Sequence, residues 1–366
     1  MSEQPVSSAR SIHHRPAIIL AVLVIFALVT SLAFALTPAD AAPEEASVEE
    51  ANQPTDVVLA VHVGTASLRE GDTDPERIEA YENGVTEALE AGRDVLAGGG
   101  RSVDAVQTAV EILEDDPAFQ AGRGAVFNTN AQHELDASIM DGSNLDAGAV
   151  AAVQNIKNPI AGARTVLDDS DHVLLASDGA DTFAREQGLE MVTQDYYFTQ
   201  DRWDALMDAK EEDPDGIAPE DITDEDEKYH GTVGAVAIDA NDDMAAATST
   251  GGRNNKEVGR VGDSPLISAG TWAKNNNVAV SGTGVGEIYI RLGAARDVGA
   301  LYEYRYRGNS QRAANEVLEK IQDLDGTGGL LVLDDRGRLS TPRTGGMPTG
   351  YVLSDGEIVL DILRED

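Results

Sequence analysis

The sequence contains no cysteine, and this absence excludes several kinds of site at once. Without a thiol, the 366-residue chain can form no disulfide framework, no thiolate metal centre and no cysteine nucleophile. Histidine is also scarce, and no two of the six histidines stand at the i, i+4 spacing of a helical zinc site. A catalytic cysteine and a transition-metal centre are therefore not expected.

Positively charged residues are also few compared with negatively charged ones. The chain has 65 Asp and Glu residues against 27 Lys and Arg residues, and its formal net charge is -38. Because so acidic a surface repels phosphate backbones, nucleic acid is not an expected partner. Acidity with little lysine is typical of proteins from halophilic organisms, in which salt screens the repulsion between carboxylates. An acidic protein from an ordinary mesophile is the alternative.

One stretch, residues 17–36, is apolar for long enough to cross a membrane. It would rise about 30 Å as a helix, and it follows a polar segment, residues 1–16, that contains Arg10 and Arg15. Basic residues before the run and acidic residues after it predict a cytoplasmic segment 1–16 and an exported remainder. Residues 17–36 are then either a retained transmembrane anchor or the core of a signal peptide that is cleaved near residues 39–41. The expected location is extracellular, secreted or on the outer face of the cytoplasmic membrane.

Composition divides the exported part into segments. Residues 42–55 are rich in Ala, Pro and Glu without apolar periodicity, which indicates a flexible tether. One folded domain is expected over residues 56–366. Within it, residues 211–230 form an acidic linker, because this stretch is crowded with Asp and Glu and shows no periodicity.

Apolar periodicity predicts both strands and helices in the folded part. We expect strands over residues 57–63, 147–153, 172–176, 232–238, 244–250, 277–281, 330–333 and 350–363. We expect helices over residues 74–96, 102–113, 159–167, 287–306 and 310–321, with Ser102 and Asn158 as N-caps. Residues 124–127 and 135–140 are expected to form a hairpin around a polar turn. Hairpins in both halves, with helices grouped between them, favour an α+β or layered αββα fold over alternating βαβ units.

A short segment rich in small residues, 230–234, follows the acidic linker and contains Gly231 and Thr232. A threonine behind a glycine can be an ordinary strand start. However, a threonine whose own backbone nitrogen is freed by cleavage carries a nucleophile and a base in one residue. An α-amine has a reference pKa of about 7.7–8.0, so it can accept the hydroxyl proton near neutrality.

The most specific signal is a series of short motifs in a fixed order. Upstream these are Ser102-Val103-Asp104-Ala105-Val106, Glu134-Leu135-Asp136-Ala137-Ser138-Ile139-Met140-Asp141-Gly142 and Lys157-Asn158-Pro159-Ile160. Downstream they are Thr232-Val233-Gly234, Thr248-Ser249-Thr250-Gly251-Gly252, Gly259-Arg260-Val261-Gly262-Asp263-Ser264-Pro265 and Thr283-Gly284-Val285-Gly286-Glu287. Over about residues 56–350 the chain resembles the plant-type (type 2) L-asparaginase and isoaspartyl peptidase family, which are N-terminal nucleophile hydrolases.

The resemblance implies a four-layer αββα sandwich and a precursor that cleaves itself between Gly231 and Thr232. Residues 56–231 would become an α subunit and residues 232–366 a β subunit, assembled as a heterotetramer of two copies of each. The implied reaction is hydrolysis of L-asparagine, of β-aspartyl dipeptides or of both, through an acyl-enzyme on Thr232. No cofactor is implied for catalysis.

The family's site residues can be carried onto matching positions. Thr250 would support the nucleophile hydroxyl, and Thr283 with the backbone N–H of Gly284 would form the oxyanion hole. Arg260 would bind the α-carboxylate of the substrate. Asp263 would bind the α-ammonium of the substrate. Thr283 and the backbone of Gly286 would supply the remaining contacts to the head group.

The resemblance also implies a structural sodium ion bound by backbone carbonyls, which are hard oxygen ligands suited to such a cation. The matching positions are Leu113, Glu114, Asp116, Phe119, Ala121 and Arg123.

The sequence departs from the family pattern in three places. The family's His-Gly-Gly is His62-Val63-Gly64 here, its Asn near the nucleophile falls at Gln120, and its closing Gly-Met-aromatic-Arg is Gly346-Met347-Pro348-Thr349. Two alternatives therefore stay open. One is a glycosylasparaginase-like hydrolase, and the other is a membrane-tethered binding protein that has lost catalysis.

Overall fold

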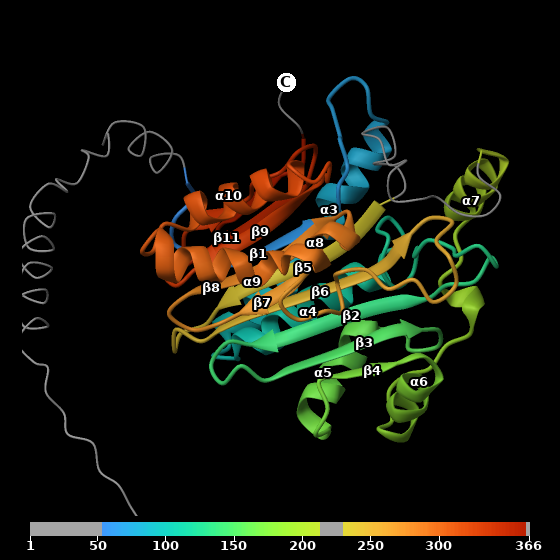
Figure 1. The fold of residues 1–366 in the computed structure, drawn as a ribbon, viewed down its shortest axis with the longest axis horizontal. Helices are drawn as coiled ribbons and strands as arrows, with labels where there is room; N and C mark the ends of the chain where they lie inside the picture. The colour runs from blue at the N-terminus through green and yellow to red at the C-terminus, as the bar shows by residue number, and fades with distance from the viewer. Residues whose placement is uncertain (1–52, 213–229, 364–366) are drawn as a thin grey trace, which may run out of the picture. The chain divides into compact units, whose positions relative to one another are not determined.

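The computed structural model describes residues 53–212 and 230–363, all of which belong to one compact unit spanning Asn52–Asp366 (Figure 1). The predicted segments 1–16 and 17–36, most of the tether 42–55 and most of the linker 211–230 lie outside the described residues. Among the residues that are described, no helix combines the length and the apolar character needed to span a bilayer.

The larger sheet has eight strands in the order β12-β11-β1-β5-β6-β2-β3-β4. Its members are β1 (Val57–Val63), β2 (Leu135–Asp141), β3 (Ala147–Val153), β4 (Leu174–Ala176), β5 (His230–Ile238), β6 (Met244–Arg253), β11 (Thr349–Leu353) and β12 (Ile358–Asp361). Neighbouring strands are antiparallel except for β3 and β4, which are parallel. The predicted pair 232–238 and 244–250 is confirmed as β5 and β6.

The smaller sheet is antiparallel, with the order β10-β9-β8-β7. Its strands are β7 (Thr271–Ala273), β8 (Val278–Gly284), β9 (Gly328–Asp334) and β10 (Leu339–Ser340). The predicted strands 277–281 and 330–333 are confirmed here as parts of β8 and β9.

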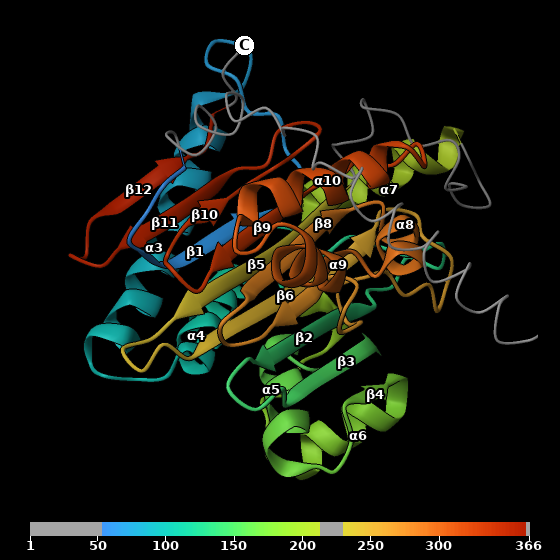
Figure 2. The same ribbon diagram turned by 60° about the vertical axis from the view of Figure 1, so that its left-hand side comes forward.

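Helices pack on the faces of the sheets (Figures 1 and 2). They are α3 (Pro75–Ala97), α4 (Ser102–Asp115), α5 (Pro159–Asp169), α6 (Ser177–Glu186), α8 (Gly286–Leu292), α9 (Ala294–Ala300) and α10 (Ser310–Gln322). One more helix, α7 (Gln200–Glu212), lies at the periphery, where Arg202 Nε donates to the Gly124 carbonyl oxygen. A 3-10 turn, Gln194–Tyr196, and a π-helical turn, Leu301–Arg305, complete the described elements. The molecule is thus of the predicted α+β class.

Three apolar clusters follow from the alternation of side chains along the strands. One cluster joins the larger sheet to α3, α4, α5 and α6, and a second joins the smaller sheet to α8, α9 and α10. The third lies between the two sheets. On β5, for example, Val233 and Ala235 face the helices whereas Val236 faces the other sheet. Every second residue of β5 therefore points between the sheets.

Four predicted elements are wrong in detail. Residues 124–127 form no strand, because β2 already pairs with β3 on one side and β6 on the other. The predicted helix 287–306 is broken at Gly293, whose left-handed φ of 61° ends α8. Residues 350–363 form the hairpin of β11 and β12, which turns at Gly356 with φ of 91°. The strand predicted over 172–176 is shorter, since β4 starts at Leu174.

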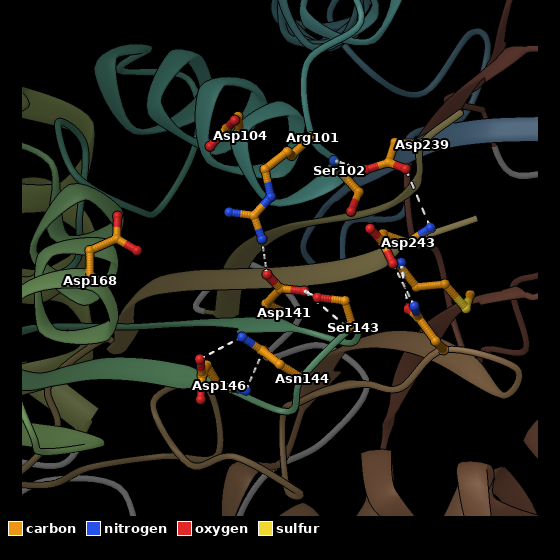
Figure 3. A network of polar contacts seen from close by, with 12 residues as sticks. Arg101, Ser102, Asp104, Asp141, Ser143, Asn144, Asp146, Asp168, Asp239 and Asp243 are labelled. Carbon is orange, nitrogen blue, oxygen red and sulfur yellow. Dashed lines mark hydrogen bonds and ion pairs between the residues drawn. The ribbon is translucent and has the colours of Figure 1, made fainter. Parts of the chain in front are cut away.

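The start of α4 also differs from the prediction. The N-cap is Arg101, and Ser102 is the first helical residue. The backbone N–H of Ser102 donates to Asp239 Oδ2 at 2.9 Å, so a carboxylate from the end of β5 caps this helix. Figure 3 shows this contact beside the ion pair of Arg101 with Asp141. This polar network holds the turns at the end of the larger sheet that is remote from Thr232.

Candidate active site

The candidate nucleophile Thr232 lies near the start of β5, opposite Thr250 on β6. Alternation places both side chains on the inter-sheet side of their strands, and it places Thr283 of β8 on the facing side of the smaller sheet. A small pocket is lined there by residues from β5, β6, β8 and the loop between β6 and β7. Its lining residues are Gly231, Thr232, Thr250, Gly252, Arg253, Arg260, Gly262, Asp263, Ser264, Thr283 and Gly284.

The hydroxyls of Thr232 and Thr250 and the Gly231 carbonyl form a short chain of hydrogen bonds. Thr232 Oγ1 donates to Thr250 Oγ1 at 3.1 Å, and Thr250 Oγ1 donates to the Gly231 carbonyl oxygen at 2.9 Å. The Gly252 N–H also donates to Thr250 Oγ1 at 2.9 Å. Because the Thr250 hydroxyl uses both lone pairs and its one proton, its orientation is fixed.

The Gly231–Thr232 peptide is packed tightly from two sides. A methyl group on Gly231 would overlap the Gln120 side chain, which is buried against it. On the other side, a Cβ atom on Gly64 would lie 2.9 Å from Gly231 Cα and 3.1 Å from Thr232 N. The departure at Gln120 therefore does contact the predicted scissile bond. Gly64, where this sequence keeps a glycine of the family pattern, lets the loop after β1 approach that bond.

Asp263 supplies a buried carboxylate to the pocket. Burial raises the pKa of Asp263 to about 7, against the opposing charge of Arg260. Asp263 Oδ2 has no hydrogen-bond partner among the described residues. A Cβ atom on Gly286 would lie 2.9 Å from Asp263 Oδ1, so the absence of a side chain there lets the Gly286 backbone come close to the carboxylate. An ammonium group would satisfy this carboxylate.

Arg260 already makes a two-pronged ion pair that sequence reasoning missed. Arg260 Nε and Nη2 donate to the two carboxylate oxygens of Glu287 at 2.9 and 3.0 Å. Burial by itself would raise the pKa of Glu287, but the hydrogen bonds and charge of Arg260 hold it below its usual range. Glu287 thus keeps the guanidinium in one orientation at the pocket. The available signal was the place of Glu287 at the end of the glycine motif 283–287.

The predicted oxyanion-hole residue Thr283 has an uncommitted hydroxyl. Thr283 Oγ1 is buried and finds no hydrogen-bond partner in the described part of the chain. Its backbone is held by Tyr289, whose hydroxyl lies 3.0 Å from the Thr283 carbonyl oxygen and 3.1 Å from that of Gly329. Gly284, with φ of 150°, ends β8 beside it. The wall of the site therefore carries a hydroxyl that is free to donate, on a backbone that is held in place.

His62 is a buried neighbour of the site and not an exposed base. Burial lowers the pKa of His62 to about 3, although a hydrogen bond to the Thr232 backbone acts in the opposite direction. Its Nε2 atom lies 2.8 Å from Ser281 Oγ, which in turn lies 2.8 Å from Thr248 Oγ1. The neutral ring therefore helps to join the two sheets next to Thr232.

The predicted sodium ligands are backbone oxygens at the end of α4 and in the loop after it. Within residues 53–212 and 230–363, no group of three His, Cys, Asp or Glu side chains is arranged to hold a metal ion. The loop after α4 folds back so that the Arg123 N–H donates to the Glu114 carbonyl at 2.6 Å. A Cβ atom on Gly124 would lie 2.6 Å from the carbonyl oxygens of Pro117 and Phe119. Carbonyl oxygens of this kind are the hard ligands that suit a monovalent cation, and several of them lie close together in this loop.

The chain is similar to known proteins over most of its length. The family model described as asparaginase matches residues 55–358. An isoaspartyl peptidase of Escherichia coli (strain K12) is 40% identical over 309 residues, which cover 84% of this chain and 96% of that protein. Isoaspartyl peptidase/L-asparaginases of Mus musculus and Homo sapiens are 41% and 39% identical over 298 and 310 residues, covering 81% and 84% of this chain and 86% and 97% of theirs. The chain therefore belongs to the asparaginase family of N-terminal nucleophile hydrolases and is an enzyme of that family.

Proposed function

We propose that the enzyme cleaves itself between Gly231 and Thr232 and then hydrolyses L-asparagine, β-aspartyl dipeptides or both. The observation that carries this proposal is the hydrogen-bonded set of Thr232, Thr250 and the Gly231 carbonyl at a pocket that also contains Arg260 and Asp263. The names of the relatives support this reading over a glycosylasparaginase, because they are isoaspartyl peptidases and L-asparaginases.

In the precursor, Thr232 Oγ1 attacks the Gly231 carbonyl carbon. The Thr250 hydroxyl donates to the Gly231 oxygen and stabilises the negative charge that develops on it. The peptide C–N bond breaks, the nitrogen takes up a proton, and Gly231 is held as an ester on the threonine oxygen. Water then hydrolyses this ester, which releases a Gly231 carboxylate and leaves Thr232 with a free hydroxyl and a free α-amine.

In the mature enzyme, the α-amine of Thr232 accepts the proton of its own hydroxyl, and Oγ1 attacks the side-chain carbonyl of the substrate. Thr283 Oγ1, which is otherwise unpartnered among described atoms, and the Gly284 N–H would donate to the oxyanion. Ammonia leaves from asparagine, or an amino acid leaves from a β-aspartyl dipeptide. Water hydrolyses the acyl-enzyme to release aspartate.

The substrate head group would be held by opposite charges. Asp263 Oδ2 would accept from the α-ammonium, and Arg260 would bind the α-carboxylate with the donors that Glu287 leaves free. The backbone of Gly286 would contribute beside Asp263, where a larger residue has no room. The reaction then needs no cofactor, since nucleophile, base and binding groups all belong to the chain.

The assembly is part of the same proposal. We expect the two sheets and their covering helices to form the four-layer αββα sandwich of N-terminal nucleophile hydrolases, because apolar clusters lie between the sheets and under each helix group. Residues 56–231 and 232–366 would assemble as a heterotetramer of two copies each. A sodium ion bound by carbonyls of residues 113–123 would brace the loop that carries Gln120 and take no part in the chemistry.

Composition alone supports export and adaptation to salt. Residues 17–36 would direct the enzyme outward as an anchor or as a cleaved signal peptide, and the net charge of -38 suits a saline exterior. Sequencing the N-terminus of the secreted or membrane-bound protein decides between anchor and signal peptide. Assays in low and molar salt test the second point, and activity that salt does not increase would count against halophily.

The function is tested by the Thr232→Ala variant. We expect this variant to fold, to remain one chain on denaturing electrophoresis, and to lose hydrolysis of both asparagine and β-aspartyl dipeptides by at least a thousandfold. Thr232→Ser, which keeps a hydroxyl, is the matched control and should still yield a fragment that starts at residue 232. Hydrolysis at the wild-type rate by Thr232→Ala would refute the nucleophile assignment.

A further inference from the structure

The function described above leaves the motif Glu134-Leu135-Asp136-Ala137-Ser138 without a role. Every second residue of a strand faces the same side, so Glu134, which directly precedes β2, and Ser138, in the middle of β2, can reach the same neighbouring segment. That segment is residues 259–264, the loop that carries Arg260 and Asp263. The polar contacts of Glu134 and Ser138 explain why the motif is built from these residue types.

Glu134 holds the beginning of the loop. The Gly259 N–H points at the Glu134 carboxylate, 3.2 Å from Oε1 and 3.0 Å from Oε2. Glu134 is itself held, because Asn128 Nδ2 donates to its Oε2 at 3.1 Å and Lys256 Nζ donates to its backbone carbonyl at 2.7 Å. Glu134 is buried, its carboxylate accepts from two N–H donors and its backbone carbonyl accepts from Lys256, so it is rigid and fixes the position of Gly259 next to Arg260.

Ser138 holds the end of the loop. Ser138 Oγ donates to the Ser264 carbonyl oxygen at 2.6 Å and lies 2.8 Å from Thr271 Oγ1. Ser138 is fully buried and Ser264 nearly so, so no water competes for these contacts. Ser264 directly follows Asp263, and its position sets the direction in which that carboxylate enters the pocket.

The two contacts therefore fix a six-residue loop at both ends from one rigid strand. Between them lie the guanidinium and the carboxylate that bracket the substrate head group. The loop contains Gly259 and Gly262, which by themselves would leave its backbone loosely determined. To recognise two charges that are a fixed distance apart, both binding groups must be held within about 0.5 Å of their productive positions.

We propose that Glu134 and Ser138 are positioning residues that set the spacing of Arg260 and Asp263 and thereby the selectivity for a head group with both a free α-ammonium and a free α-carboxylate. The proposal rests on the function proposed above. It concerns substrate selection and not the bond-making step, because neither side chain lines the pocket around Thr232.

The test compares L-asparagine with succinamate, which has the same amide and carboxylate but no ammonium group. In Glu134→Gln and Ser138→Ala, we expect cleavage at Thr232 to be complete, KM for asparagine to rise at least fivefold, and kcat to change less than threefold. The ratio of kcat/KM for asparagine to that for succinamate should fall at least fivefold. This ratio does not depend on the fraction of active enzyme, so general destabilisation would leave it unchanged.

Ser249→Ala is the matched control. Ser249 is an equally buried serine on a strand of the same sheet, but it points to the helix side and donates to Glu114 at 2.6 Å. It should keep the wild-type ratio. Wild-type ratios in both Glu134→Gln and Ser138→Ala would overturn the proposal, as would a loss of selectivity in Ser249→Ala of the same size.

A binding measurement separates this proposal from the function on which it rests. The affinity of each protein for L-aspartate and for succinate is measured calorimetrically, which requires no catalysis. The proposal expects the preference for aspartate to fall in both variants even if the wild type hydrolyses neither substrate. A wild-type protein that binds aspartate selectively but is inactive would refute the proposed reaction alone, whereas unchanged preferences in the variants would refute the positioning role alone.

Discussion

At the scale of single residues, the site depends on where side chains are absent. Gly64 has φ of 87° and lies against the Gly231–Thr232 peptide, so the Cβ of an alanine there would press on the bond proposed to be cleaved. Attack by Thr232 Oγ1 requires this peptide to hold its position within a fraction of an ångström. The retained glycine in the altered segment His62-Val63-Gly64 is therefore the part of the family pattern that the chemistry requires.

Gly64→Ala should slow self-cleavage at least tenfold, because its Cβ would displace the scissile peptide from Thr232 Oγ1. Gly71→Ala is a matched control, since Gly71 has φ of 88° but a Cβ atom added there would meet no atom within 4 Å. Both variants bear a similar backbone cost of about 1 kcal/mol, but only Gly64→Ala should accumulate precursor in a time course on denaturing gels. Equal cleavage rates in the two variants would contradict the steric argument.

The residues that carry the chemistry could be predicted from the sequence, whereas the residues that hold them in place could not be predicted to the same extent. Thr232 and Thr250 stand on adjacent strands whose pairing follows from a short turn, and the structure brings both together with Arg260, Asp263 and Thr283. The contact of Glu287 with Arg260 could not be predicted in the same way. It depends on how the first turn of a helix meets a loop 27 positions earlier, which periodicity does not specify.

At the scale of elements, one buried carboxyl joins two helices to the nucleophile's neighbouring strand. Glu114 of α4 accepts from the backbone N–H of Ile160 in the first turn of α5 at 2.9 Å and from Ser249 of β6 at 2.6 Å. Burial raises the pKa of Glu114 to about 8, more than the hydrogen bonds from Ser249 and Ile160 lower it. The folded protein therefore keeps this carboxyl protonated at neutral pH.

Stability should fall as this carboxyl is forced to ionise. Between the unfolded pKa of 4.5 and the folded pKa of about 8, the native state holds a proton that the unfolded chain has lost. Raising the pH through this window therefore favours unfolding by about 1.4 kcal/mol per pH unit. Glu114→Gln keeps an oxygen acceptor and cannot ionise, so its stability relative to the parent should increase from pH 5 to pH 8.

This prediction is measured by urea unfolding at pH 5, 6, 7 and 8, in a Thr232→Ala background that keeps the chain in one piece. The control is Glu87→Gln on the exposed side of α3, which should show a constant difference from the parent. A constant difference for Glu114→Gln as well would mean that Glu114 is ionised in the folded protein.

Elements with strong periodicity could be predicted from the sequence, and those set by tertiary contacts could not. β1, α3 and α5 lie where the apolar spacing predicts them. The segment 124–127 is as apolar as a strand, yet Gly124 has φ of 99° and the neighbouring edge of β2 is already taken. Likewise, the left-handed Gly293 divides the predicted helix 287–306, although a single glycine is tolerated within many helices.

At the scale of the whole molecule, the two sides of the proposed cleavage site are interleaved. β1 precedes Gly231, yet it lies between β11 and the part of β5 from Val233 to Ala237, and both of these follow the proposed cleavage site. β2 also precedes the site and pairs with β6, which follows it. The apolar cluster under α3 and α4 draws residues from both sides of the cut. Cleavage therefore removes one covalent bond but leaves the hydrogen bonds and the core of the larger sheet in place.

Both fragments should consequently remain together after cleavage. We expect the processed enzyme to elute from a size-exclusion column at the volume of intact Thr232→Ala, and the fragment starting at Thr232 to appear alone only in denaturant. The reason is that separation would break three strand pairings of the larger sheet and expose the shared apolar core. The free energy of these contacts is far larger than the effect of removing one covalent link between the fragments. Elution at the size of two copies of each fragment would support the heterotetramer. A free fragment under native conditions would show that the interleaved strands do not hold the halves together.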